Sequence, residues 1–156
     1  MTDRQPNETT AAACGLRPTS CVARDVAGML RAASLRPTRQ RIALGRLLFG
    51  RGDRHLTAEM LHEEAVGARV AVSLATIYNT LNQFTDAGLL RQVAVEGAKS
   101  YFDTNIDDHH HFYIEGENRL VDIPGSGLSV AGLPGAPDGF EIARVDVVVR
   151  VRPKSR

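Results

Sequence analysis

Apolar residues recur at helical spacing in the segment 73–88 of this chain. The positions on this face are Leu74, Ile77, Leu81 and Phe84. Ser73 is a suitable N-cap, and Gly88 is a suitable stop after the last turn. The opposite face is polar but uncharged, with Ala75, Thr76, Tyr78, Asn79 and Asn82. Such side chains suit the major groove of DNA, although an ordinary surface helix would show the same pattern.

Weaker helical patterns come before this segment and a strand pattern follows it. Helices are expected over 22–33, 39–49 and 58–68, and Thr38 and Thr57 are expected to cap the last two. Residues 89–95 and 99–103 are expected to form a β-hairpin that turns at Gly97. Helices in series followed by a hairpin predict a winged helix-turn-helix DNA-binding domain over residues 21–102.

A second, smaller unit is expected over residues 103–156. Short strands are predicted at 110–115 and 119–123, and a longer one at 140–152, where valines alternate strictly from Val145 to Val151. Five glycines and three prolines between residues 124 and 139 leave room for a short helix at most. A unit this small cannot bury the last strand alone, so a homodimer formed through the sheet is expected. The predicted fold class is α+β, a winged-helix domain followed by a small α/β dimerisation domain.

The composition places the chain among soluble globular proteins, with 43% hydrophobic and 24% charged residues. Residues 1–20 are small, polar and unpatterned, which predicts a disordered tail. No apolar run is long enough to cross a bilayer, and the N-terminus lacks a secretory signal. The two cysteines, Cys14 and Cys21, form no CxxC pair. A cytoplasmic protein without membrane association or disulfides is therefore expected.

The charge is distributed unevenly. Residues 1–97 carry twelve Arg and nine acidic residues, a net charge of +3, whereas residues 98–156 carry seven Lys or Arg and nine acidic residues, a net charge of −2. Between Arg31 and Arg54 there are seven arginines against one acid, Asp53. Because guanidinium groups bond phosphate oxygens bidentately, this cluster supports binding of double-stranded DNA.

Three of the five histidines are consecutive, His109, His110 and His111, and they follow two aspartates. On a strand, His109 and His111 face one side and His110 faces the other. Imidazole and carboxylate together favour Zn, Fe or Mn, and imidazole also ligates haem iron. A polar strand end is the alternative, but three histidines beside acids favour binding. His55 and His62, taken singly, are expected to be structural.

An enzyme is the competing class, because a His and Asp cluster could hold the ion of a metallohydrolase. The sequence contains no HExxH, no nucleophile motif and no phosphate loop. The chain is therefore not expected to be an enzyme.

Several motifs, in this order and spacing, resemble the ferric uptake regulator (Fur) family. They are LRPTRQR, HLTAEMLHEEA, SLATIYNTLNQFTDAGLLRQV and YFDTN…HHHFYIE…LVDIP, and the resemblance covers residues 35–152. Within the family they resemble the iron response regulator (Irr) branch. The resemblance implies a homodimeric transcription factor that binds AT-rich operators. Arg36 would reach into the minor groove, and the major-groove contacts would be Ser73, Thr76, Tyr78 and Asn79.

The resemblance also implies a metal site between the two domains. Its ligands would be His55, Asp103, His109, His111 and Asp122, with Asp103 in place of the longer Glu of the family. A second family site keeps only Asp108 and His110 and is not expected to be intact. Four-cysteine structural zinc is excluded, because Ile114 and Glu117 stand where the first cysteine pair would be.

The Irr branch is linked to haem, and the resemblance implies that haem acts at His109, His110 and His111. Cys21 is a secondary candidate ligand, since it lacks the following Pro of the branch's haem motif. The expected function is an iron- and haem-responsive regulator of haem synthesis and iron homeostasis genes. The alternative is a Fur-type sensor of free Mn(II) or Fe(II) without haem.

Overall fold

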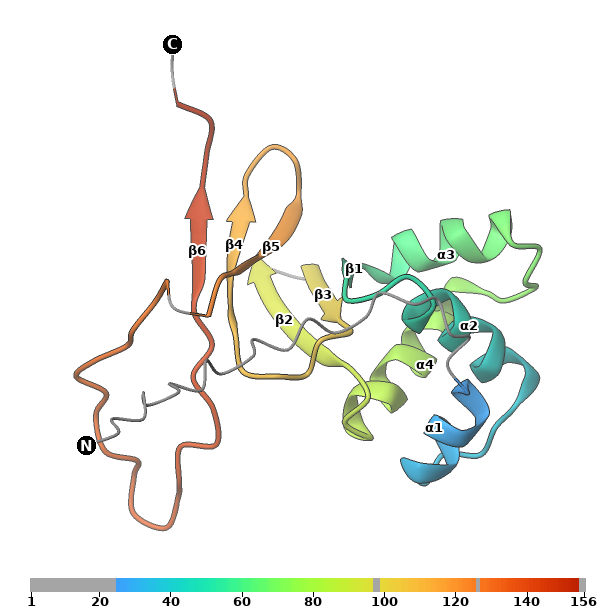
Figure 1. The fold of residues 1–156 in the computed structure, drawn as a ribbon, viewed down its shortest axis with the longest axis horizontal. Coiled ribbons are helices and arrows are strands. Elements are labelled where there is room, and N and C mark those ends of the chain that lie inside the picture. The colour runs from blue at the N-terminus through green and yellow to red at the C-terminus, as the bar shows by residue number, and fades with distance from the viewer. Residues whose placement is uncertain (1–24, 97–98, 126, 155–156) are drawn as a thin grey trace, which may run out of the picture.

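A computed structural model describes residues 25–96, 99–125 and 127–154 (Figure 1). The helices are α1 (Val26–Ala32), α2 (Arg39–Phe49), α3 (Ala58–Gly67) and α4 (Leu74–Asp86). The strands are β1 (His55–Leu56), β2 (Arg91–Glu96), β3 (Lys99–Asp103), β4 (His110–Ile114), β5 (Arg119–Ile123) and β6 (Val148–Val151). This mixture of separate helices and sheets confirms the predicted α+β class. None of the helices described is both long enough and apolar enough to span a membrane.

The helix starts follow the capping residues of the sequence. The hydroxyls of Thr38, Thr57 and Ser73 each accept from the backbone N–H three residues later. Among the described residues, the first helix begins at Val26, because the Asp25 carboxylate accepts from the backbone N–H of Gly28 at 2.9 Å and caps it there. Residues 22–24 of the expected helix lie outside the described part of the chain. The expected tail, residues 1–20, lies outside the described residues, as do Cys14 and Cys21.

The helices enclose a core built from the apolar faces that the sequence predicts. Its fully buried members include Leu44, Leu48, Leu61, Ile77, Leu81 and Phe84. Phe49 stacks on Phe84 with ring centroids 6.2 Å apart, which joins the end of α2 to α4. This core fixes the orientation of α4, whose polar face is left at the surface.

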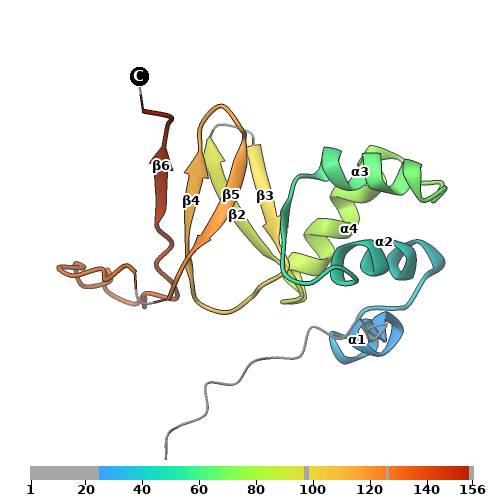
Figure 2. The same ribbon diagram turned by 45° about the horizontal axis from the view of Figure 1, so that its top comes forward.

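Two three-stranded sheets lie beside the helices (Figure 2). The first sheet has the order β1-β3-β2 and is antiparallel, and the second has the order β5-β4-β6 with β6 parallel to β4. The two-residue strand β1 is too short to be recognised in the sequence. It pairs with the end of β3, which sets His55 opposite Asp103. Asp103, the expected first residue of the second unit, is thus the last residue of the first sheet.

A small apolar cluster joins the two sheets. Its buried members are Val93, Val95, Tyr101, Tyr113 and Leu120. The hydroxyl of Tyr101 donates to the backbone oxygen of Asn118 at 2.6 Å, and that of Tyr113 donates to the Asn118 side chain at 2.8 Å. The turn between β4 and β5 is therefore fixed to the first sheet, so the two sheets form one packed unit.

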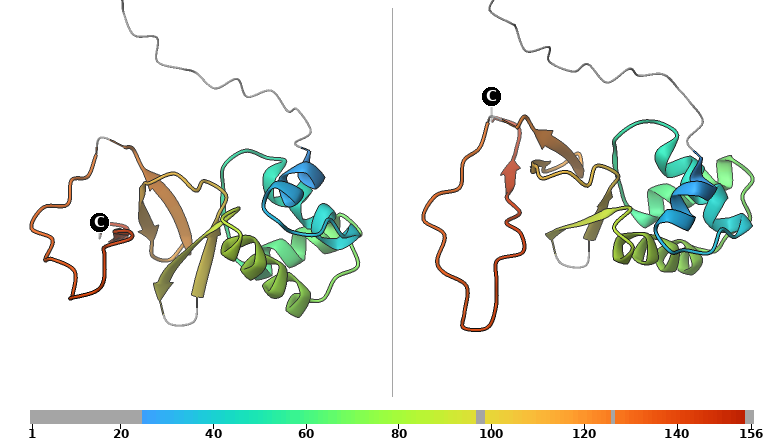
Figure 3. Two further views of the ribbon diagram at one scale, coloured as in Figure 1. Left: turned by 90° about the horizontal axis from the view of Figure 1, so that it is seen from below. Right: turned by 60° about the horizontal axis from the view of Figure 1, so that its bottom comes forward.

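The predicted strand over 140–152 is wrong for its first eight residues. Only Val148–Val151 is a strand, and it pairs with His111–Ile114 of β4. Because β4 begins at His110, residues upstream of Val147 have no neighbouring strand to bond. Residues 127–147 instead form a wide loop that projects from the second sheet, away from the helices (Figure 3). No helix occurs in this segment.

Candidate metal centre and recognition surface

The structure brings all five residues of the expected metal site together between the two sheets. His55 and Asp103 come from β1 and β3 of the first sheet. His111 and Asp122 face each other across β4 and β5 of the second sheet, and His109 lies just before β4. One potential ligand atom of each residue lies within 4.8 Å of all the others. His55, which the sequence alone would class as structural, is therefore part of the cluster.

The carboxylate of Asp103 is the centre of this cluster. Its Oδ2 lies 2.8 Å from His109 Nε2, 3.2 Å from His111 Nε2 and 3.3 Å from His55 Nε2. Two donors that bind one ion at about 2.1 Å each are roughly 3 to 4 Å apart. The spacing therefore suits a shared ion, and the shorter side chain of Asp103 reaches all three imidazoles.

Several polar atoms of the cluster are buried and lie close to one another, but none of them makes a hydrogen bond of good geometry among the described residues. They are His55 Nε2, His109 Nε2, His111 Nδ1 and Asp122 Oδ1. A buried polar atom without a partner costs about 1–3 kcal/mol, so such atoms are rarely left unpaired. Two of the imidazole nitrogens and one carboxylate oxygen face the same small volume. The donor set of three histidines and two aspartates thus fits a divalent ion such as Mn, Fe or Zn.

The cluster also shifts the titration of its members. Burial alone would lower the pKa of His55, but the carboxylates of Asp103 and Asp122 outweigh it and raise that pKa above 6.5. Burial alone would raise the pKa of Asp103, but hydrogen bonds from His111 and His55 outweigh it and hold that pKa well below 3.8. Without an ion, the two carboxylates therefore favour the protonated, positively charged form of His55.

The orientation of His109 is set by neighbouring groups. Its Nδ1 lies 2.7 Å from the backbone oxygen of Asp107, to which it donates, so Nε2 keeps the lone pair that faces the cluster. Arg91, buried at the start of β2, donates to the same backbone oxygen at 3.1 Å and also pairs with Asp146. The sequence does not mark Arg91 as functional, because nothing local indicates that this arginine is buried.

The middle histidine of the run, His110, does not take part. His110 faces the other side of β4, where its Nδ1 lies 3.4 Å from the backbone N–H of Val147. It lines a cavity of about 110 Å³ together with Ile123, Leu128 and Val145. Asp108, the other remnant of a second site, pairs with Arg144 at 3.0 Å. The three histidines therefore do not share one site.

Three of the expected DNA-contacting residues lie along one groove formed by α4 and the start of α2. Arg36, Thr76 and Asn79 line the same groove, of about 420 Å³. Tyr78 is 40% exposed and lines a different groove, between α4 and the start of α3. The Ser73 hydroxyl is engaged in the cap of α4, where it lies 2.9 Å from the Thr76 hydroxyl. Ser73 thus positions the helix as well as facing solvent.

Arg41 is a member of this surface that sequence reasoning missed. Its guanidinium donates to the Gln83 side-chain oxygen from Nη2 at 2.7 Å, and to the backbone oxygen of Arg36 from Nη1 at 2.8 Å. Arg41 therefore holds the start of α2 against α4. Only the density of arginines between Arg31 and Arg54 pointed toward it.

The sequence model of the Ferric uptake regulator family matches residues 32–131, which is more than half of the chain. The chain belongs to this family. Proteins of the family are metal-responsive transcription regulators that bind DNA and form dimers, and they are not enzymes.

Individual relatives agree with this assignment. The ferric uptake regulation protein 1 of Mycolicibacterium fortuitum is 34% identical over 128 residues, which are 80% of this chain and 77% of that protein. The ferric uptake regulation protein of Shigella flexneri is 35% identical over 85 residues, which are 54% of this chain and 57% of that protein. The match thus spans little more than half the length of the Shigella relative.

The fold agrees with a solved structure of the same family. The ferric uptake regulator of Pseudomonas aeruginosa, solved with manganese, superposes with a TM-score of 0.63 and 24% identity, covering 84% of this chain and 99% of that chain. At this level of identity, the similarity shows that the two chains share a fold.

Proposed function

We propose that this chain is a regulator whose binding to operator DNA depends on one divalent ion held between its two sheets. The observation that carries the proposal is the convergence of His55, Asp103, His109, His111 and Asp122 on one small volume. Two of these ligands belong to the first sheet and two to the second, so an ion bound by all of them favours the packed arrangement of the sheets.

The coupling to DNA follows from the position of α4. This helix belongs to the core that includes Leu56 of β1, the strand that also carries His55. An ion that ties His55 to the second sheet therefore restricts where α4 lies relative to the second sheet. Occupancy and operator affinity are linked reciprocally, because the ion has to bind one arrangement better than the other.

On the DNA side, each proposed contact has a chemical role. Tyr78 presents its ring and hydroxyl in the major groove. The side-chain amide of Asn79 is suited to two hydrogen bonds with adenine there, one donated and one accepted. Thr76 and Ser73 supply hydroxyls near the start of α4. Arg36 is exposed before α2 and is proposed to enter the minor groove of an AT-rich operator, where the narrow groove concentrates negative potential.

A homodimer is part of the proposal. Several large apolar side chains of the loop between β5 and β6 are exposed: Leu133, Phe140 and Ile142, of which Phe140 is 76% exposed. Exposed apolar groups of this size favour burial against a second copy of the chain. Two recognition helices related by a two-fold axis would then read paired half-sites.

The ion is proposed to be Mn(II) or Fe(II). Three imidazoles and two carboxylates suit both ions as well as Zn(II). The P. aeruginosa relative described above was solved with manganese, which supports the choice.

Haem is the second candidate signal, and what favours it is the resemblance of the His109–His111 run to the Irr branch, whose members are linked to haem synthesis and iron homeostasis. His110 is half-buried beside apolar side chains, as a haem ligand would be. The cavity beside it is far smaller than a porphyrin, so haem would have to displace the loop that includes Val145 and Val147. Haem held by His109 or His111 would compete with the divalent ion.

A pair of titrations tests the proposal. Full-length protein, freed of metal with a chelator, is titrated with Mn(II) while its affinity for an operator duplex is followed by fluorescence anisotropy. The operator duplex is first selected from a random library in the presence of Mn(II). We expect saturable binding of one ion per chain and tighter DNA binding with the ion. DNA affinity that does not change on metal addition would refute the coupling.

The haem candidate is separated by the same assay with ferric haem, using wild type, His110→Ala and His111→Ala. If His110→Ala abolishes haem binding and Mn(II) does not affect it, the haem site lies on the face of β4 that carries His110. Haem binding lost in His111→Ala and inhibited by Mn(II) would place haem in the metal centre. Absence of saturable haem binding would leave the divalent ion as the signal.

A further inference from the structure

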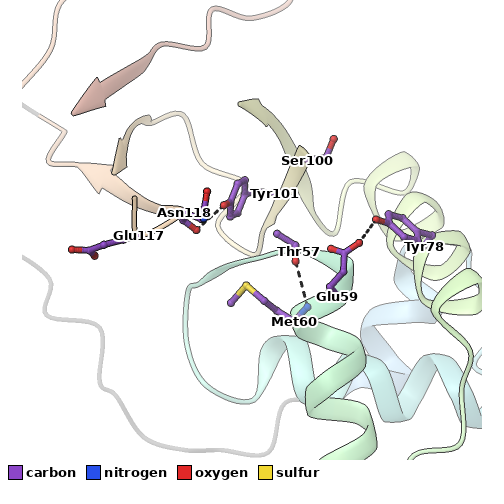
Figure 4. A pocket seen from close by; sticks show the side chains of 8 residues that line it. All are labelled: Thr57, Glu59, Met60, Tyr78, Ser100, Tyr101, Glu117 and Asn118. Atoms are coloured by element: carbon purple, nitrogen blue, oxygen red, sulfur yellow. Dashed lines mark hydrogen bonds between the residues drawn. The ribbon is translucent and has the colours of Figure 1, made fainter. Parts of the chain in front are cut away.

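The helix α4 is flanked by two grooves that carry opposite charge. On one side, the groove against the start of α2 has Arg36 and Arg41 as its charged lining residues. On the other side, a groove of about 470 Å³ lies between α4, the start of α3 and the sheets, with Glu59 and Glu117 as its charged lining residues (Figure 4). Among the described side chains that line them, the first groove has no carboxylate and the second has no Lys or Arg.

Glu59 is fixed at the border between α4 and the acidic groove. The hydroxyl of Tyr78 donates to its Oε1 at 2.5 Å, the contact drawn as a dashed line in Figure 4. This hydrogen bond lowers the pKa of the Glu59 carboxyl and raises the pKa of the Tyr78 hydroxyl. Glu59 also lies in the first turn of α3, where the helix dipole favours a negative charge. The carboxylate is therefore ionised, and it is held next to a side chain that we propose contacts DNA.

We propose that Glu59 is a specificity-determining residue for DNA, which excludes phosphates from the Tyr78 side of α4. A duplex docked with its backbone over the acidic groove would set phosphates against a fixed carboxylate. A duplex docked with its backbone over the basic groove would set phosphates against Arg36 and Arg41. Like-charge contact in the wrong register is a standard way to gain specificity, because it weakens incorrect binding more than correct binding.

The inference rests on the proposed function, since it assumes that α4 enters the major groove. It goes beyond that function by assigning a role to an acidic residue that lies on a DNA-binding surface and would otherwise only oppose binding. A purely structural role is the competing explanation, because Glu59 stabilises the start of α3. The two explanations differ in what they predict: a structural role changes the stability of the protein, and a specificity role changes the ratio between two DNA affinities.

The test compares two duplexes and uses full-length protein in the presence of Mn(II). One duplex is selected from a random library with the wild-type protein, and the other has the same base composition in shuffled order. In Glu59→Gln the side-chain oxygen can still accept from Tyr78, but the charge is gone. We expect affinity for the shuffled duplex to rise roughly two- to fivefold, which is the size of one screened surface charge. Affinity for the selected duplex should rise less, so the ratio between the two falls.

Glu63→Gln is the matched control, because it removes one exposed charge from the same helix one turn further on. A ratio that Glu59→Gln leaves unchanged, or that Glu63→Gln lowers equally, would overturn the inference. So would a lowered melting temperature in Glu59→Gln with an unchanged ratio. Tyr78→Ala distinguishes a failure of the proposed DNA-binding role of α4 from a failure of the role proposed for Glu59. If it does not weaken binding to the selected duplex, the proposed role of α4 is wrong; if it does and Glu59→Gln keeps the wild-type ratio, only the role of Glu59 is wrong.

Discussion

His55 and Asp122 belong to different sheets, yet His55 Nε2 lies 2.9 Å from Asp122 Oδ1. The first sheet supplies two of the five candidate ligands, and β4, β5 and the residue before β4 supply the other three. The candidate metal centre is therefore complete only while the two sheets are packed together. This makes ion binding and domain arrangement two measures of the same equilibrium.

Replacing His55 should weaken binding of the ion and its link to the arrangement of the two sheets. In His55→Ala, the first sheet keeps only Asp103 as a ligand, and we expect Mn(II) affinity to fall by at least about tenfold, since even outer-shell changes cost about 10- to 100-fold. Isothermal titration calorimetry measures the affinity. His62→Ala is the control, because His62 on α3 is half-buried but lies outside the cluster. Equal affinity in His55→Ala and wild type would show that the ion binds elsewhere.

The stability of the metal-free protein should depend on pH in two windows. The pKa of His55 is raised above 6.5 in the folded state, so its protonated form stabilises the fold. This contribution is fully present below pH 6.5 and is lost as the pH rises through the folded pKa. The pKa of Asp103 is held below 3.8, so its contribution is present above that pH and is lost on further acidification.

Urea denaturation in the presence of a chelator tests this dependence. We expect the free energy of unfolding to decline as the pH rises from 6.5 to about 8, the range in which histidine loses its proton. His55→Ala should reduce that decline. With Mn(II) present the trend should reverse, because protons then compete with the ion for the imidazoles. Metal-free wild-type protein that becomes more stable over this range would contradict the assignment.

Tyr78 and Arg36 are proposed to contact different parts of DNA, so their replacement should change DNA affinity in different ways. Tyr78→Ala should weaken binding to the selected duplex by about 1–3 kcal/mol, with little effect on a shuffled one, because base contacts carry sequence information. Arg36→Ala should weaken both and reduce the slope of log affinity against log salt by about 1, because its guanidinium replaces counterions of the phosphates. Anisotropy titrations at several salt concentrations measure both quantities. An unchanged slope in Arg36→Ala would remove Arg36 from the interface.

A stability prediction follows from the helical core. Leu61 on α3 has no exposed surface, and Leu61→Ala should lower the free energy of unfolding by about 2–5 kcal/mol through lost burial and the cavity left behind. Val66 is 63% exposed on the same helix, and Val66→Ala should change the free energy of unfolding by less than about 0.5 kcal/mol. Chemical denaturation followed by circular dichroism compares the two. Similar values for both variants would mean that α3 does not pack as described.

The sequence alone determined the elements whose signals are local. The apolar face of α4 and the caps Thr38, Thr57 and Ser73 could be predicted because each depends on residues within one or two helical turns. The pairing of β2 with β3 could be predicted from the alternation of apolar residues in two nearby segments. Strand alternation predicted that His109 and His111 face one site, whereas His55, Asp103 and Asp122 were added only by the resemblance to the family. The contact between His55 and Asp122 joins residues far apart in the chain, and no local pattern predicts such a contact.

Only the tertiary structure decided which of these residues come together and which stay apart. It paired the two-residue strand β1 with β3, which brought His55 to Asp103. It separated His110 from His109 and His111, since neighbouring strand residues face opposite sides. It limited β6 to Val148–Val151, because a strand extends only as far as its neighbour β4 does. It also joined Tyr78 to Glu59, and such contacts depend on how helices pack, which no local pattern encodes.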